Sequence, residues 1–221
     1  MPHVWLIRHG QASFGAANYD MLSELGAEQA RRLGRWLAAH DVRPARLIHG
    51  TLTRQRETAE ALAEGMAEAG GGGAPAFEVH PGLDEHDADA LLRGWLAAGN
   101  PPPPAGDRKA HFKTLTAAVL AWQAGKIDGA ESFAAFEARV ADAVRLAAEG
   151  PRPAFCVSSG GPIGQAVRAA LGAPAEAQIR LQMQAKNAGF TRLAGRADRL
   201  TLLSFNETPH LDDDPDAVTW S

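Results

Sequence analysis

The chain has 221 residues and carries 22 Lys and Arg against 26 Asp and Glu, a formal net charge of -4 at pH 7. This length predicts one domain with a sizeable core, and the absence of a lysine- or arginine-rich block argues against binding to nucleic acid. The single cysteine, Cys156, excludes an internal disulfide, and no stretch has the pattern of a leader peptide or the roughly 18 apolar residues of a membrane span, so we expect a cytoplasmic protein without membrane contact.

The first half of the sequence alternates between strand and helix patterns. Residues 4–7 form a short apolar run, typical of a strand that is buried on both faces of a parallel sheet. The apolar spacing from residue 25 predicts an amphipathic helix with Ser23 as its N-cap. Two more strands are predicted at residues 45–49 and 76–80, with a helix at residues 53–66 between them.

The second half begins with a segment of different character. Residues 87–150 contain helical pieces interrupted by four prolines at 101–104 and by glycines, and we expect a helical insertion or lid over the active-site end of a single domain spanning residues 1–221. Alternation then resumes, with strands expected at 154–158, 188–193 and 200–205 and a helix at 163–171. This order predicts a doubly wound α/β fold, a mostly parallel central sheet flanked by helices.

Polar side chains follow four of the predicted strands at the point where each strand ends. Arg8 and His9 follow the first, residues 51–54 the second, residues 84–86 the third and residues 158–161 the fourth. Ligands of doubly wound folds gather at the carboxyl ends of the strands. These groups are therefore expected to converge on one crevice.

Two of the converging groups are arginines, Arg8 and Arg54. The planar guanidinium group matches phosphate bidentately and keeps its charge, so the pair indicates a doubly charged oxyanion such as a phosphate monoester. Helix N-termini near Thr53 and Pro162 would add backbone N–H groups. We expect a small phosphorylated substrate, and neither metal nor cofactor is needed because the arginines neutralise the charge.

His9 and Glu85 are the candidate reactive groups of this crevice. A neutral imidazole can attack phosphorus and form a phosphohistidine, and the Glu85 carboxyl group can protonate the leaving oxygen if burial and the anionic phosphate raise its pKa. Each candidate has an ordinary structural alternative. His9 could simply be hydrogen-bonded at a strand end, Arg54 could lie on a solvated helix face, and Glu85 could belong to a solvated acidic loop.

Four segments within the first 90 residues resemble motifs of the histidine phosphatase superfamily, also called the phosphoglycerate mutase-like family. Residues 6–12 contain its Arg-His-Gly signature, and residues 22–30 are similar to its Leu-Thr-x-x-Gly-x-x-Gln-Ala helix start. Residues 52–59 resemble its second arginine motif, and residues 82–85 its Leu-x-Glu acid. Because short members of this family are mostly phosphatases, the resemblance implies phosphatase rather than mutase activity.

The resemblance also implies a role for each matched residue. His9 would be the phosphorylated nucleophile, Arg8 and Arg54 the phosphate clamps, and Glu85 the proton donor. Further candidates for binding the phosphate or substrate are Gln11, Asn18, Ser158, Ser159 and Gly160.

One family motif departs from the expected pattern. The family carries Ser-His-Gly-Gly after its last core strand, whereas this sequence reads Ser158-Ser159-Gly160-Gly161, so Ser159 stands where the second catalytic histidine is expected. Losing one preorganised donor costs about 10²–10³ in rate, which predicts weakened turnover with phosphate binding less affected. We hypothesise that the two serine hydroxyls with the two glycine amides, or alternatively His86, compensate.

Two other function classes stay open. The first is a phospholigand-binding or regulatory module of the same fold that has lost the chemistry, for which Ser159 is the main support. The second is a serine hydrolase that uses Ser158 or Ser159 with His210, although the Gly-x-Ser-x-Gly spacing of a nucleophile elbow is absent. The sequence is compatible with a homodimer and does not determine the oligomeric state.

Overall fold

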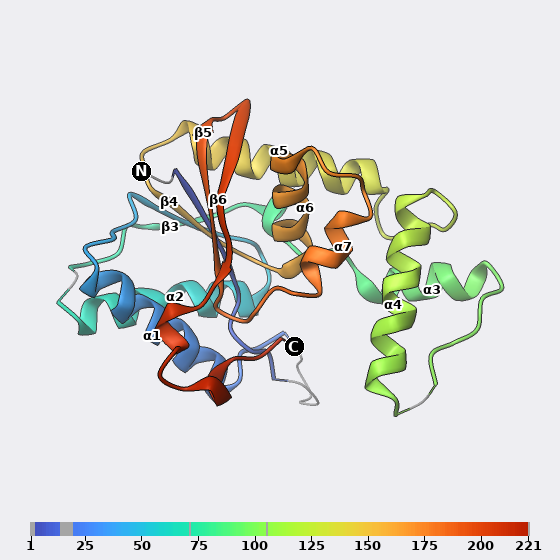
Figure 1. The fold of residues 1–221 in the computed structure, drawn as a ribbon, viewed down its shortest axis with the longest axis horizontal. Coiled ribbons are helices and arrows are strands. Elements are labelled where there is room, and N and C mark those ends of the chain that lie inside the picture. Colours follow the sequence, from blue (N-terminus) through green and yellow to red (C-terminus); the bar gives the residue numbers. More distant parts are fainter. Residues whose placement is uncertain (1–2, 14–19, 71, 105, 221) are drawn as a thin grey trace.

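A computed structural model describes residues 3–13, 20–70, 72–104 and 106–220. Its centre is a six-stranded sheet in the order β3-β2-β4-β1-β5-β6, with helices on both faces (Figure 1). Strands β1 (Val4–Arg8), β2 (Arg46–His49), β3 (Phe77–Val79) and β4 (Ala154–Ser158) are parallel. Strand β5 (Phe190–Arg196) is antiparallel to β1, and β6 (Arg199–Glu207) is antiparallel to β5. The predicted doubly wound, mostly parallel α/β fold is confirmed.

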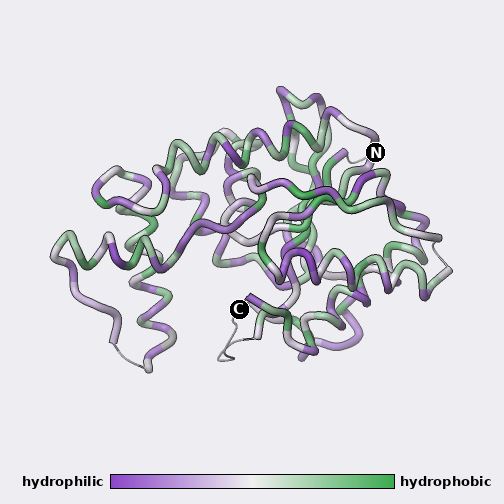
Figure 2. Tube along the Cα trace, turned by 180° about the vertical axis from the view of Figure 1, so that it is seen from behind, coloured by the Kyte–Doolittle hydropathy of each residue, from purple (hydrophilic) through white to green (hydrophobic). Residues whose placement is uncertain are grey.

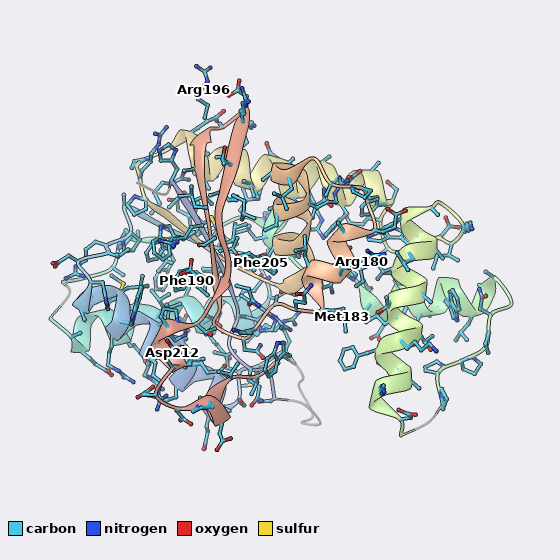
Figure 3. The ribbon with its side chains drawn as sticks, in the orientation of Figure 1. Arg180, Met183, Phe190, Arg196, Phe205 and Asp212 are labelled. Carbon is cyan, nitrogen blue, oxygen red and sulfur yellow. The ribbon has the colours of Figure 1, made fainter. Side chains whose placement is uncertain are left out.

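The strands that were predicted from apolar runs differ in how far they are buried. Strand β1 is buried along four of its five residues, as expected for a strand with helices on both faces. Strand β3 lies at the edge of the sheet and is only three residues long, with Val79 58% exposed. Strands β5 and β6 form a hairpin that extends beyond the predicted ranges, with Arg196 at its tip (Figure 3).

Helices α1 (Glu24–Ala39) and α2 (Thr53–Glu68) pack together against one face of the sheet. The predicted N-cap of α1 is confirmed, because the Ser23 hydroxyl accepts a hydrogen bond from the Gly26 N–H at 3.0 Å. The two helices approach closely at Gly34 and Gly65. A Cβ at either glycine would lie 2.1 Å from a backbone oxygen of the other helix, so only glycine allows this contact.

Helices α5 (Phe133–Glu149) and α6 (Gly160–Leu171) cover the opposite face, and the short α7 (Ala177–Gln182) packs beside α6. Side chains of β1 alternate between the two faces: Trp5 and Ile7 belong to the core under α1 and α2, while Val4 and Leu6 belong to the core under α5 and α6. Hydrophobic stretches accordingly run through the centre of the molecule, where the inner strands lie (Figure 2).

The segment 87–150, which was predicted as a helical insertion, has two parts. Helices α3 (Ala88–Ala97) and α4 (Arg108–Gln123) lie together beside the sheet and extend away from it, whereas α5 packs on the sheet itself (Figure 1). Asp87 and Asp107 cap α3 and α4 by accepting hydrogen bonds from backbone N–H groups. A lid function of α3 and α4 stays a prediction.

Candidate active site

The carboxyl ends of β1, β2 and β4 meet at one edge of the sheet, where the structure contains a cavity of about 840 Å³. Arg8, His9, Arg54, Glu85 and His86 all line this cavity. The sequence pattern predicted that the strand ends carrying all five residues would converge. They do so because the parallel strands end side by side and the helix α2 begins directly after β2.

The backbone around His9 is held from three sides. The His9 N–H donates to the Ser158 carbonyl at 2.9 Å, and the Asn187 side chain donates to the His9 carbonyl at 3.1 Å. The next residue, Gly10, passes directly against α1, where a Cβ would lie 2.2 Å from the Gly26 carbonyl oxygen. The chain can therefore leave β1 in this direction only with glycine at position 10.

The hydrogen bonds of the His9 ring define its tautomer. Nδ1 lies 2.7 Å from the Gly10 carbonyl oxygen, which can only accept, so Nδ1 carries the proton. Nε2 accepts a hydrogen bond from the Arg54 Nε–H at 3.2 Å, so its lone pair points at a guanidinium group that lines the same cavity. Burial, and then the charges of Arg54 and Arg8, hold the pKa of His9 well below its usual value. The ring is neutral and can act as a nucleophile at physiological pH.

The two arginines are anchored by different parts of the chain. Arg8 Nη1 donates to the carbonyl oxygen of Ala185 and to that of Trp220, the latter at 3.3 Å. Arg54 Nη1 donates to Asp20 Oδ1 at 2.6 Å, and the second oxygen of Asp20 accepts from the Thr53 N–H at 2.8 Å. Nothing in the sequence around Asp20 signals this role, because its partner lies 34 residues away.

Glu85 is held between the start of α6 and the neighbouring histidine. The Gly161 N–H donates to Oε2 at 3.0 Å, and His86 Nδ1 lies 2.8 Å from Oε1. Burial acts to raise the pKa of Glu85, but the His86 ring, the Gly161 N–H and the charge of Arg54 outweigh it and lower the pKa to about 2. The expectation that burial raises this pKa is therefore wrong for these surroundings.

The two serines at the end of β4 are fully buried and bond within the protein. Ser158 donates its hydroxyl hydrogen to the Leu83 carbonyl at 2.7 Å, and the Ser159 hydroxyl oxygen accepts from Gln55 Nε2 at 2.9 Å. Neither serine lines the cavity. Since the Gly161 N–H is bonded to Glu85, the hypothesis that these hydroxyls and amides form an anion-binding nest is not supported by their contacts.

A serine hydrolase would need a histidine beside one of these hydroxyls. In the described part of the chain no hydrogen bond joins the hydroxyl group of Ser158 or Ser159 to a histidine ring. His210 is buried in a single turn of 3₁₀ helix, Pro209–Leu211, which packs against α1. Among the described residues, neither serine hydroxyl therefore has the hydrogen bond to a base that a serine nucleophile requires.

The remaining predicted binding residues have different positions. Gln11 lines a second cavity of about 660 Å³, which shares Arg8 with the first. Gly160 begins α6 beside Arg8, because a Cβ on it would lie 3.8 Å from Arg8 Nε. Asn18 lies outside the described residues.

The outer part of the cavity is formed by residues that the sequence pattern did not single out. Helices α3 and α4 and the loops before them contribute acidic and aromatic side chains, and the far end of the chain contributes Trp220, which is 55% exposed. Met183, directly after α7, lines the second cavity together with Phe112 and Leu115 of α4 (Figure 3). Only the tertiary fold brings these segments to the site.

The described residues contain no group of three or more His, Cys, Asp and Glu side chains that could hold a metal ion. Within the same ranges, no helix combines the length and the apolar character that crossing a membrane requires.

A family model of the histidine phosphatase superfamily (branch 1) matches residues 4–208. The chain belongs to this superfamily. A search of curated protein sequences finds no significant match, so the further similarity comes from solved structures.

Several solved structures of this superfamily's fold resemble the chain over nearly its whole length. A mycobacterial glucosyl-3-phosphoglycerate phosphatase in complex with inorganic phosphate is 24% identical, with a TM-score of 0.65, covering 95% of this chain and 99% of the other. A phosphoserine phosphatase from Entamoeba histolytica in complex with 3-phosphoglyceric acid is 20% identical, with a TM-score of 0.64, covering 96% and 100%. A phosphoglycerate mutase from Bacillus anthracis is 17% identical, with a TM-score of 0.64, covering 94% of each chain. These similarities show a phosphoglycerate mutase-like fold.

Proposed function

We propose that this histidine phosphatase superfamily member hydrolyses phosphomonoesters of small metabolites through a phosphohistidine at His9. The observation that carries the proposal is the His9 ring, whose Nδ1–H is bound to the Gly10 carbonyl and whose unprotonated Nε2 lies against Arg54 at the cavity that both residues line. The guanidinium groups of Arg8 and Arg54 line the same cavity. A neutral nucleophile next to two fixed positive charges suits attack on a phosphate dianion.

The reaction follows from these positions in two steps. In the first, Nε2 of His9 attacks phosphorus, the bond from phosphorus to the ester oxygen breaks, and the leaving oxygen takes a proton delivered by Glu85. In the second, water attacks the phosphohistidine while Glu85 accepts one of its protons, and the bond from His9 to phosphorus breaks. The products are an alcohol and inorganic phosphate. Arg8 and Arg54 balance the charge of the phosphoryl group throughout.

The relatives support a small phosphorylated substrate. Two of the similar phosphatases are in complex with 3-phosphoglyceric acid and with inorganic phosphate. In this chain the cavity of about 840 Å³ leaves room beyond the arginines for the alcohol part of such an ester.

A panel of phosphomonoesters assayed with the wild type and with His9→Ala tests the proposal. We expect turnover by the wild type, its loss in His9→Ala, and a phosphohistidine that can be trapped by quenching without acid. His49→Ala is a matched control, because His49 is a buried histidine at the end of β2 whose Nδ1 lies 2.6 Å from the Gly50 carbonyl oxygen but which does not line the cavity. Equal activity in the wild type and His9→Ala would overturn the mechanism.

A second candidate is a binding or regulatory module that uses the same crevice without turnover. Two observations favour it. Ser159, which stands where the family resemblance implies the second catalytic histidine, is buried and bonded to Gln55. The low pKa of Glu85 keeps this carboxylate ionised. This alternative predicts that phosphate or vanadate binds, that no phosphomonoester is hydrolysed and that no phosphohistidine forms.

A further inference from the structure

The source of the proton for the leaving oxygen is the open chemical question of this site. Glu85 is placed to deliver it, since it lines the cavity together with His9 and Arg54. The carboxylate, however, is surrounded by groups that donate to it: the N–H groups of Gly161 and His86 lie at 3.0 and 3.1 Å. A carboxylate stabilised in this way needs a partner that transfers a proton to it at the moment of bond breaking.

His86 is the side chain that reaches the same carboxylate. Its Nδ1 lies 2.8 Å from Glu85 Oε1, and only 2% of the side chain is exposed. The two atoms are close, but their arrangement is not that of a formed hydrogen bond. Catalytic hydrogen bonds often have such geometry without substrate and tighten in the reactive complex.

Aromatic side chains hold the His86 ring against Glu85. The Trp122 ring of α4 lies 5.6 Å away between centroids, and the Phe136 ring of α5 lies 5.7 Å away, edge to face. On the remaining side is Gly161, where a Cβ would come within 2.8 Å of Nδ1. The ring therefore has little freedom to leave the carboxylate, while it still lines the cavity.

We propose that His86 is a proton relay for Glu85, a positioning residue that supplies through Glu85 the proton taken up by the leaving oxygen. The inference rests on the proposed phosphatase function. In the first step the Nδ1 proton of the His86 imidazolium ion passes to Oε1 of the ionised Glu85. The carboxyl group formed in this way gives its proton to the leaving oxygen, which leaves His86 neutral and Glu85 ionised again. In the second step the proton that Glu85 accepts from the attacking water returns to Nδ1, so the pair regains its starting state. No other reactant is needed.

The test compares two leaving groups in His86→Phe, which keeps an aromatic ring of similar size beside Trp122 and Phe136. For an alkyl phosphomonoester, whose alkoxide leaves only when protonated, we expect kcat to fall about 10²-fold or more, the usual contribution of general acid catalysis. For p-nitrophenyl phosphate, whose phenolate leaves without a proton, we expect a fall of less than about tenfold. KM and the affinity for vanadate should stay near the wild-type values.

A merely structural role of His86 would lower turnover of both esters by the same factor, and that result would overturn the proposal. His86→Gln repeats the comparison if His86→Phe does not fold, and His49→Ala serves as the control for replacing a buried histidine. Glu85→Gln gives the second criterion. In the Glu85→Gln background, His86→Phe should cause no further loss with the alkyl ester, and an additional loss of the full size would contradict a relay through Glu85.

Different results would overturn the proposed phosphatase function and the His86 relay. If wild-type turnover of p-nitrophenyl phosphate does not depend on His9, the proposed function fails. If turnover depends on His9 but both leaving groups respond equally to His86→Phe, only the relay fails.

Discussion

The substitution Gly161→Ala should displace the Glu85 carboxylate while it costs the fold little stability. Gly161 belongs to the first turn of α6, and a Cβ on it would lie 2.0 Å from Glu85 Oε1, whereas ordinary van der Waals contact begins at 3.4 Å. The carboxylate must therefore move by roughly 1.4 Å, the difference between these distances. Because a misplacement of about 1 Å can cost about 10²-fold in rate, we expect kcat to fall by at least that factor.

The expected effect of Gly161→Ala on stability is much smaller. Moving Glu85 breaks its charged hydrogen bond with the Gly161 N–H, which costs about 1.5–3 kcal/mol. Alanine offsets part of this, because it is favoured over glycine inside a helix by about 0.5–1 kcal/mol. The net loss is therefore about 0.5–2.5 kcal/mol.

The assay measures kcat and KM with an alkyl phosphomonoester, the Kd of vanadate, and unfolding by urea. Gly73→Ala is the control, since a Cβ at that position meets no atom within 4 Å. If Gly161→Ala kept kcat within about twofold of the wild type while folding normally, Glu85 would not be the group that delivers the proton.

Three further predictions concern single side chains. Ser159→Ala should leave kcat within about twofold and cost about 1 kcal/mol of stability, because its hydroxyl bonds to Gln55 and not into the cavity; complete loss of activity in enzyme kinetics would instead favour the serine hydrolase. Burial, and secondarily Arg32, lowers the pKa of His210 from 6.5 to about 3, so its contribution to stability is present above about pH 6.5 and is lost as the pH falls towards 3, by up to about 1.4 kcal/mol per pH unit. Urea unfolding of His210→Leu should accordingly depend less on pH between 7 and 5 than that of the wild type, and equal slopes would refute this. Burial raises the pKa of Cys156 to about 12, so iodoacetamide should label this thiol only after unfolding, as mass spectrometry can show; rapid labelling of the native protein would be inconsistent with its burial.

The sequence by itself determined the order of strands and helices and the side at which polar groups gather. Apolar runs such as residues 4–7 can be buried only between helices, and parallel strands all end at the same edge of the sheet. Arg8 ends β1, His9 follows it and Arg54 lies in the first turn of α2 after β2, so their convergence was predictable from local pattern alone. The same holds for the Ser23 cap, which involves residues three positions apart.

Contacts between distant segments were decided only by the tertiary structure. Asp20 binds Arg54 across 34 positions, and the Trp220 carbonyl accepts from Arg8 across 212. No local pattern encodes such pairs. Likewise, the pKa of Glu85 depends on the Gly161 N–H, 76 positions away, as well as on the adjacent His86. A pKa is set by every charge, donor and apolar group around a carboxylate, so it exists as a property of the folded site and not of the sequence motif.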